Sequence, residues 1–398
     1  MVGIKRLTNF IDESIKNVYE MDFPYNYLRR GIDSKGKKQV IFFGGGFKNT
    51  VYLDMPEFIK RMNLCLDYIR QQFHGCDLYY KPHQNEPDDE RRNYDLKSFE
   101  ILNTKEVVEM YFLKNLQKID CVFAVTSYAA INAYKAGINS YIFYKIFEDV
   151  FDDSNRLHYK FVFGKLPKSF FIEDLNKKLI KHNNTPKTSD DFLLNFLKKL
   201  LSSPERQKVW ITVDHPGSLL KIVSLANLVR KVRNVKAVNL IVSKHRTWEN
   251  IDMKHLESYF DGIYFFPRHD YSLRRLKNLI SLFKTRLQVK KLKISKEDLI
   301  MNLSPCEFIE NMVVSSFKKC KKITFVPKNA YEEHTNIDFL EKNQFSFTRT
   351  SFIFNRVVEP ILSINRALVL NSKEGVEPFT FIKYEKPLNK IYDYVFFY

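Results

Sequence analysis

The sequence predicts an α/β protein built from two Rossmann-like domains with mostly parallel sheets. Short β-rich runs alternate with longer helical runs in the first half of the chain, and the same alternation begins again near residue 207. A polar stretch with a proline, residues 181–191, separates the two halves and is the best linker candidate. At 398 residues the chain is also too long for one ordinary hydrophobic core.

The first half contains four runs with strand character, each followed by a turn or a helical pattern. The expected strands are residues 38–47, 76–83, 119–126 and 139–146, and the expected helices are residues 57–73, 104–116 and 127–137. One face of the first helix is predicted to be buried, and it carries Phe58, Met62, Cys65, Leu66 and Ile69. Thr104 is the N-cap candidate of the second helix.

The second half repeats this order and ends in an aromatic, basic tail. The expected strands are residues 207–218, which run into a turn, and residues 235–243, 260–266, 298–304 and 321–327. The expected helices are residues 219–232 and 305–317, the second with a proline in its first turn. The tail, residues 381–398, is suited either to a membrane surface or to packing back across the domain interface. We therefore expect one domain over residues 1–182 and a second, with the tail, over residues 190–398.

Composition limits the class of partner. The chain is 44% hydrophobic and carries a net charge of +18, from 64 Lys and Arg against 46 Asp and Glu. This excess favours an anionic partner such as a sugar nucleotide, a nucleic acid or a membrane surface, or else reflects a basic bias spread over the surface. The five cysteines show no C-x-x-C spacing and are expected to be reduced core residues of a cytosolic protein. No apolar leader or bilayer-spanning run is apparent, so we expect any membrane contact to be peripheral.

Parallel sheets bind ligands at the carboxyl ends of their strands, so strand-to-helix turns are the places to search. Gly44, Gly45 and Gly46 would let the backbone approach a phosphate or ribose closely, although they match neither G-x-G-x-x-G nor a P-loop. Thr126 and Ser127 offer hydroxyl and N–H groups at a helix N-terminus, which favours an anion. A plain N-cap is the alternative for this pair.

Lys81 and His83 follow the second expected strand. A histidine at this position could donate a proton or a hydrogen bond to a leaving phosphate, whereas a buried structural histidine is the alternative. The acidic residues between Glu86 and Glu90 are expected to form a solvated face, with a metal site as the alternative. Because they show no recognisable ligand spacing, no metal site is predicted.

Asp214 and His215 form the first turn of the second half. An aspartate beside a histidine could act as general base for a hydroxyl nucleophile, or the aspartate could cap the following helix. Residues 266–275 add Arg268, His269, Arg274 and Arg275, which suit either an anionic acceptor or phosphate, or solvation of the surface. The sequence lacks G-x-S-x-G and H-E-x-x-H, which argues against a hydrolase elbow and a zincin.

Four pieces of the first half carry a family resemblance. In order, "IFFGGGF", "YYKPHQNE", "ILNTKEVVEMYF" and "FAVTSYAAINAYKAG" resemble the nucleotide-binding domain of GT-B glycosyltransferases. The nearest likeness is to bacterial sialyltransferases and Kdo transferases, which use CMP-activated acidic sugars in capsule and lipooligosaccharide synthesis. The resemblance implies that His83 contacts or protonates the departing CMP phosphate and that Thr126 and Ser127 hold it. It also implies that Glu106 or Glu109 lies near the nucleotide ribose.

The resemblance leaves the donor and the domain arrangement open. Polymer-forming transferases that use CDP-glycerol or CDP-ribitol have a similar histidine turn followed by a serine turn. The domain with the nucleotide-binding likeness comes first in this chain, whereas GT-B enzymes usually place it second. This implies either a permuted GT-B order or two Rossmann-like units with a different relationship.

The resulting expectation is a metal-independent glycosyltransferase whose first domain binds a nucleotide-sugar, with CMP as a candidate nucleotide and no further cofactor. Its acceptor would be a glycan or glycolipid of the capsule or lipopolysaccharide, bound on the side of the second domain. The expected location is the cytoplasm, with any membrane contact peripheral on the inner face of the cytoplasmic membrane. The alternatives are a CDP-alditol polymer transferase and a non-catalytic protein that binds a glycan or, with only the charge in its favour, a nucleic acid.

Overall fold

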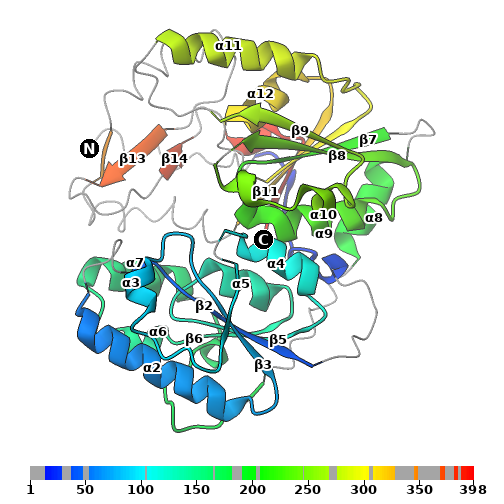
Figure 1. The fold of residues 1–398 in the computed structure, drawn as a ribbon. Helices are drawn as coiled ribbons and strands as arrows, with labels where there is room; N and C mark the ends of the chain where they lie inside the picture. The colour runs from blue at the N-terminus through cyan, green and yellow to red at the C-terminus, as the bar shows by residue number, and fades with distance from the viewer. Residues whose placement is uncertain are drawn as a thin grey trace.

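The computed structural model describes most of the chain. The described residues are 14–28, 37–47, 53–103, 105–164, 166–181, 191–202, 207–244, 246–268, 276–303, 308–327, 345–347, 368–372, 381–383 and 387–398. Two mostly parallel sheets with helices between their strands form two Rossmann-like domains, so the predicted fold class is confirmed (Figure 1).

The first sheet has five strands in the order β4-β3-β2-β5-β6, and every neighbouring pair is parallel. The strands are β2 (Gln39–Phe43), β3 (Asp77–Lys81), β4 (Glu100–Ile101), β5 (Ile119–Ala124) and β6 (Asn139–Ile142). The central strands β2 and β5 are apolar from Val40 and from Cys121 onward, because helices cover both faces of a parallel sheet. The order places a topological switch point between β2 and β5, where the connections leave in opposite directions.

Helices and short turns connect these strands or follow β6, the last of them. They are α2 (Met55–Gln72), α3 (Asp88–Arg91), α4 (Val108–Asn115), α5 (Tyr128–Lys135), α6 (Tyr144–Phe147), α7 (Asp153–Phe163) and η3 (Lys168–Phe170). The predicted apolar face of α2 is fully buried at all five expected positions. Asp54 and a proline in the first turn start this helix, and the Asp54 side chain accepts a hydrogen bond from the Glu57 N–H.

The second sheet has seven strands in the order β1-β15-β11-β10-β7-β8-β9, and all its pairs are parallel. The strands are β1 (Val18–Glu20), β7 (Gln207–Val213), β8 (Val235–Lys244), β9 (Gly262–Pro267), β10 (Leu299–Asn302), β11 (Lys321–Val326) and β15 (Tyr394–Phe397). Read from β9, the order is β9-β8-β7-β10-β11-β15-β1. If β7 is counted as the first strand, the first six strands of this order follow the Rossmann order 3-2-1-4-5-6. This sheet therefore has its switch point between β7 and β10.

The helical elements around the second sheet include several that the sequence did not predict, and α11 is the longest of them. They are η2 (Tyr25–Leu28), α8 (Phe192–Leu200), η4 (Pro216–Ser218), α9 (Leu219–Val229), η5 (Arg246–Asn250), α10 (Met253–Glu257), α11 (Leu276–Lys290), α12 (Phe308–Ser316) and α16 (Leu388–Ile391). A separate antiparallel sheet is formed by β12 (Phe345–Phe347), β13 (Leu368–Ser372) and β14 (Phe381–Lys383).

The two ends of the chain lie side by side in the second sheet. Val18 pairs with Val395, and the Asn17 side-chain amide donates to the backbone carbonyls of Asn389, Tyr392 and Asp393 at 3.0 to 3.1 Å. Residues 18–20, which the predicted division assigned to the first domain, are thus part of the second sheet. The boundary between residues 182 and 190 stays a prediction.

The end of the C-terminal tail is a buried strand, β15, and not a surface segment. Val395, Phe396 and Phe397 of β15 are buried between β1 and β11. The interpretation of this tail as a membrane-surface element is therefore wrong, because the apolar side chains that would have entered the lipid belong to the core. The final residue, Tyr398, packs on Phe23 with ring centroids 4.8 Å apart.

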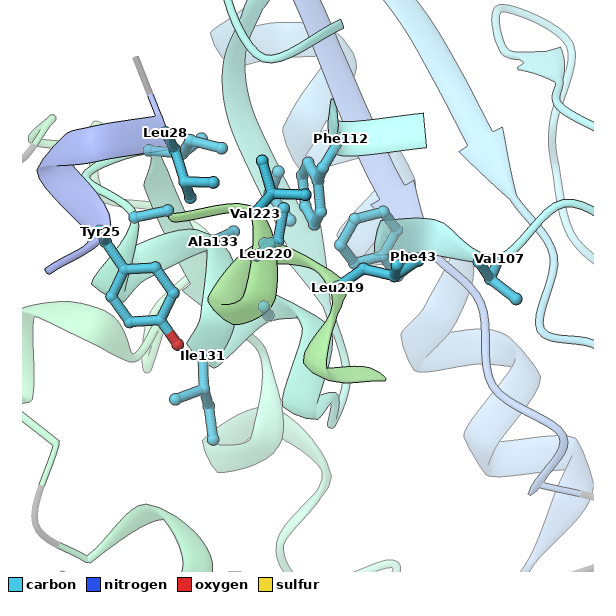
Figure 2. Packing of buried hydrophobic residues seen from close by; sticks show 14 of the residues in the cluster. Tyr25, Leu28, Phe43, Val107, Phe112, Ile131, Ala133, Leu219, Leu220 and Val223 are labelled. Atoms are coloured by element: carbon cyan, nitrogen blue, oxygen red, sulfur yellow. The ribbon is translucent and has the colours of Figure 1, made fainter. Parts of the chain in front are cut away.

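Apolar packing joins the two domains. Leu219, Leu220 and Val223 of α9 lie against Phe43 at the end of β2 and Phe112 of α4, as Figure 2 shows. All five side chains are at most 4% exposed. Since burial of each such side chain contributes about 1.5–3 kcal/mol, this contact holds the carboxyl end of β2 next to the turn that follows β7.

Two predicted local structures differ in detail. Residues 144–146, expected to extend a strand, begin the short helix α6 instead. Helix α4 begins four residues later than the predicted start, and its N-cap is Val107, which makes no side-chain cap bond. Thr104, the predicted cap, lies outside the described residues, as does the proline predicted to begin α12. None of the described helices is long and apolar enough to span a bilayer.

Candidate functional site

The glycine turn after β2 packs against the turn after β3. A Cβ on Gly44 would overlap the Glu86 carboxylate and the Tyr80 hydroxyl, and a Cβ on Gly46 would lie 2.8 Å from the Asn85 carbonyl oxygen. The absence of side chains at Gly44 and Gly46 is therefore explained by protein packing between two turns. Phosphate contact by Gly44, Gly45 and Gly46 stays a prediction.

Glu86 is the buried centre of this turn pair. It is 8% exposed and accepts hydrogen bonds from the Tyr80 hydroxyl at 2.9 Å and from the His83 N–H at 3.1 Å. The Glu86 N–H bonds back to the His83 carbonyl at 3.0 Å, so residues 83 and 86 close a reciprocal turn. Burial raises the pKa of Glu86 to about 7, against the lowering effect of these hydrogen bonds.

The expectation that residues 86–90 form a solvated acidic face is therefore wrong at Glu86 and Glu90, which are buried. Glu90 is 1% exposed and accepts a hydrogen bond from the Tyr94 hydroxyl at 2.7 Å. Asp88 and Asp89 are exposed, as predicted, in the short helix α3. The tyrosine hydroxyls donate hydrogen bonds that offset the cost of burying Glu86 and Glu90. The linear pattern of acidic residues did not reveal these donors.

His83 stands exposed at the end of this turn with one ring nitrogen engaged. Its Nδ1 accepts a hydrogen bond from the Asn85 N–H at 3.2 Å, so in the neutral ring the proton resides on Nε2. Partial removal from water, and secondarily the Lys81 ammonium, lower the pKa of His83. Near neutral pH, His83 is thus a neutral hydrogen-bond donor through Nε2–H and a poor source of a full proton.

Lys81 is a buried cation below this turn. It is 2% exposed, and its Nζ donates to the Asn103 carbonyl at 2.6 Å. Burial lowers the pKa of Lys81 to about 8, while Glu106, Glu86 and Glu109 act in the opposite direction. The group therefore keeps a positive charge near neutral pH, at the carboxyl edge of the first sheet.

Ser127 is the N-cap of α5, at the other side of the switch point. Its Oγ accepts a hydrogen bond from the Ala129 N–H at 3.1 Å. This is the capping role that the sequence offered as the alternative to phosphate binding. Thr126, directly before it, is half-buried, and anion binding by this pair stays a prediction.

Glu106 lies at the boundary between the domains and is engaged in an ion-pair network. Lys114 contacts Glu106 at 2.8 Å and Asp252 of the second domain at 2.9 Å. Glu106 therefore takes part, through Lys114, in a link between α4 and the start of α10. Its predicted contact with a nucleotide ribose is untested.

Asp214 follows β7 at the switch point of the second sheet. It is 6% exposed, and its Oδ1 has no hydrogen-bond partner among the described residues. Arg268 forms an ion pair with this oxygen through its Nε at 3.7 Å, beyond hydrogen-bond distance. The Asp214 backbone carbonyl accepts from the indole N–H of Trp248 at 2.8 Å, which fixes the turn. An almost buried carboxylate oxygen is thus held in place with acceptor capacity unused by the described protein groups.

His215 has the same local geometry as His83. Its Nδ1 accepts a hydrogen bond from the Gly217 N–H at 3.0 Å, which again places the proton of the neutral ring on Nε2. A ring held this way can donate through Nε2–H, whereas acceptance of a proton needs a free ring nitrogen. Of the two predicted base candidates, the geometry favours Asp214 over His215.

Glu109 joins the two halves of the site. It is the second residue of α4, and its Oε1 lies 3.8 Å from the position of a Cβ on Gly217, in the turn of the second domain. Burial raises the pKa of Glu109 to about 7, although Lys221 of α9 and Lys81 pull it downward. A carboxyl group with a pKa of about 7 therefore lies beside the histidine turn of the second domain, where Lys81 of the first domain also acts on it.

The structure thus places predicted site residues of both domains after strands of the two sheets, and Glu109 connects part of them. Glu109 lies beside Gly217 in the turn of His215, and the Lys81 ammonium acts on the same carboxyl group. His83 follows Lys81 by two residues, and Asp214 directly precedes His215. The sequence alone did not indicate the raised pKa values of Glu109 and Glu86. It also did not indicate that Lys221 acts on the Glu109 carboxyl group. The family resemblance named Glu109 only as a residue near the ribose. Its position in the first turn of α4, which packs on α9, is the feature that could have indicated its role. Within the described residues, no group of three or more His, Cys, Asp or Glu side chains could hold a metal ion.

Comparisons with known proteins give little further information. No protein-family model matches the chain, and no curated protein matches its sequence. Among solved structures, the chain is similar to the crystal structure of Acinetobacter baumannii MurG, with 12% sequence identity over 82% of this chain and 92% of that one and a TM-score of 0.18. A likeness at this level carries no argument, so the function is inferred from the site.

Proposed function

We propose that this protein is a glycosyltransferase that moves a sugar from a nucleotide-activated donor to an acceptor hydroxyl between the two sheets. The observation that carries the proposal is the position of Glu109. This carboxyl group, with a pKa of about 7, comes from the first domain and lies beside the turn of the second domain. A group poised at neutral pH where two Rossmann-type edges face each other suits acid–base chemistry on two substrates.

The first domain supplies the donor side. Rossmann-type sheets bind nucleotides outside the switch point, which here lies between β2 and β5. When the bond to the sugar breaks, negative charge develops on the departing phosphate. The Nε2–H of His83 and the Lys81 ammonium are the groups that would stabilise this charge. Because the pKa of His83 is lowered, its contribution is a hydrogen bond and not transfer of a proton.

The acceptor side needs a base and a group that orients the hydroxyl. Glu109 has the pKa that suits a general base at neutral pH, and the unpartnered Oδ1 of Asp214 suits acceptance of a hydrogen bond from the nucleophile. Assignment of Asp214 as the base is the alternative, and comparison of the Glu109→Gln and Asp214→Asn variants separates the two. Loss of the neutral-pH rate limb in only one variant assigns the base to that residue.

The finer parts of the proposal concern the donor and the acceptor. A CMP-activated acidic sugar and a capsule or lipooligosaccharide acceptor are supported by the resemblance of the first-domain motifs. A CDP-alditol donor presents the same phosphate chemistry to His83 and Lys81, so a panel of donors must separate them. A peripheral position on the inner face of the cytoplasmic membrane would bring the enzyme to a lipid-linked acceptor.

Release of nucleotide from a panel of CMP-, CDP-, UDP- and GDP-activated donors tests the proposal, with water as the default acceptor. We expect one class to turn over and the His83→Ala variant to lower this rate roughly 10²- to 10⁴-fold. His74→Ala is the matched control, because His74 is an exposed histidine in the loop before β3. Near-normal turnover by His83→Ala would remove His83 from the mechanism, and no turnover of any donor would favour the non-catalytic alternative.

A further inference from the structure

An exposed apolar stripe runs along α11, the helix at the outer edge of the second domain (Figure 1). Ile280, Phe283 and Leu287 are 50%, 40% and 61% exposed. Their spacing places them on one helical face, since residues three, four and seven apart share a face. The opposite face is buried through Leu282, Thr285 and Val289, each at most 1% exposed, so α11 carries one buried face and one exposed apolar stripe.

A basic pocket adjoins this stripe. It has a volume of about 480 Å³ and lies between the C-terminal halves of α11 and α12 and the segments that precede β10 and β11. Its cationic lining residues are Arg286, Lys290, Lys296, Lys318 and Lys319. Lys296 pairs with Glu297 at 3.3 Å, whereas Lys290, Lys318 and Lys319 form no ion pair with another described residue. The Ser316 hydroxyl, also in the lining, has no hydrogen-bond partner among the described residues.

Helix geometry connects the stripe with the pocket. Arg286 and Lys290 each follow a stripe residue by three positions, so they flank the stripe on the side of the pocket. Lys284 follows Phe283 by one position and Lys291 follows Leu287 by four, which places both lysines on the other side of the stripe. The pattern is an apolar face bordered by cations on both sides, which is the pattern of a helix that lies in the interface of an anionic bilayer.

We propose that α11 and the adjoining pocket form a docking surface for an anionic lipid bilayer, with the apolar stripe in the acyl boundary and a lipid phosphate in the pocket. A second copy of the chain is a poorer occupant, because a symmetric contact through α11 would bring the cations of both copies together. A nucleic acid would satisfy the cations but would leave the apolar stripe without a partner. The inference stands independently of the proposed enzymatic function.

The test is flotation of the full chain with vesicles of phosphatidylcholine, with and without phosphatidylglycerol. We expect binding only to the anionic vesicles, and we expect Phe283→Ser/Leu287→Ser and Lys318→Glu/Lys319→Glu each to lower the bound fraction at least about tenfold. The controls are Leu64→Ser, which removes an apolar side chain 49% exposed on α2, and Lys97→Glu, which reverses an exposed charge of the first domain. Both controls should bind as the wild type does.

Three results would overturn the proposal. They are equal binding of the wild type to both vesicle types, unchanged binding by either double variant, and binding to RNA without binding to vesicles. All substituted side chains are exposed, so the variants should keep the thermal unfolding midpoint of the wild type. Nucleotide binding by the double variants should also stay unchanged, which separates a failure of this surface from a failure of the interdomain site.

Discussion

Glu109 of the first domain lies beside Gly217 of the second, with its Oε1 3.8 Å from the point that a Cβ on Gly217 would occupy. The apolar contact between α9 and the end of β2 fixes this approach (Figure 2). Charges of both domains act on the same carboxyl group, because Lys81 and Lys221 each favour its ionised form while burial opposes it. The relative position of the domains thus sets the protonation state of the candidate base.

Glu109→Gln should remove the neutral-pH dependence of turnover. A base with a pKa of about 7 gives a rate that rises with pH through that value, since only the ionised form accepts a proton. The glutamine keeps the shape of the side chain but cannot act as a base, so we expect a loss of about 10²- to 10⁴-fold and a flat profile. Steady-state rates between pH 5 and pH 9 measure this, and a variant that keeps the same rising limb would exclude Glu109 as the base.

The unfolding free energy should fall as the pH rises through the titration of Glu86. Burial raises the pKa of Glu86 from 4.5 to about 7, so the folded state binds more protons than the unfolded state between these values. Stability from this group is therefore present below pH 4.5 and is lost progressively up to about pH 7, by at most about 3 kcal/mol.

Glu86→Gln should remove this contribution to the pH slope, as urea denaturation at several pH values would measure. Because Glu109 also has a raised pKa, the unfolding free energy of the variant is still expected to depend on pH. The pH slope of the variant must therefore be compared with that of the wild type and not with zero. The interpretation fails if the two proteins show the same slope between pH 4.5 and pH 7.

Gly44→Ala should destabilise the fold by about 3 kcal/mol, because the new methyl group would overlap Glu86 and Tyr80. Gly75→Ala is the control: it introduces the same methyl group in open space at a φ of +82°, and its cost should be about 1 kcal/mol of backbone strain. The Gly44→Ala/Glu86→Ala double variant should lose less than the sum of the single losses. Additive losses in chemical denaturation would show that the two turns do not pack as described.

Asp298→Ala should destabilise the second domain by about 2–4 kcal/mol. The Asp298 carboxylate accepts hydrogen bonds at 3.0 Å from the Lys208 N–H, the Trp210 indole N–H and the Ser295 N–H, and it is 3% exposed. The alanine variant leaves these donors unsatisfied in a buried place. Asp298→Asn should lose less, since its amide oxygen still accepts. Equal midpoints for wild type and Asp298→Ala in tryptophan-monitored unfolding would contradict this account.

Much of the fold follows from local sequence patterns, and the elements that the sequence did not predict have physical causes. The strands around Phe42, Phe123 and Ile211 were predictable because apolar runs bounded by turns are typical of parallel sheets. The pairing of β1 with β15 was not, because it joins Val18 to Val395 at opposite ends of the chain. Helix α11 was missed because its two apolar faces and interspersed lysines blur the helical period.

The candidate site was predictable in its positions and less so in its chemistry. Strand ends identified His83 and Asp214 because ligands bind at the carboxyl edges of parallel sheets. The tautomer of His83 depends on a backbone N–H at Asn85, and the burial of Glu86 depends on the Tyr80 hydroxyl. These contacts exist only once the chain has folded, so residue types alone could not reveal them.

Calorimetric titration of the full chain with CMP, CDP, UDP and GDP tests the central claim most directly. The account predicts that one nucleotide binds selectively and that His83→Ala weakens it while His74→Ala and Lys318→Glu/Lys319→Glu do not. Absence of binding by all four nucleotides, together with salt-sensitive binding of a polyanion, would contradict it.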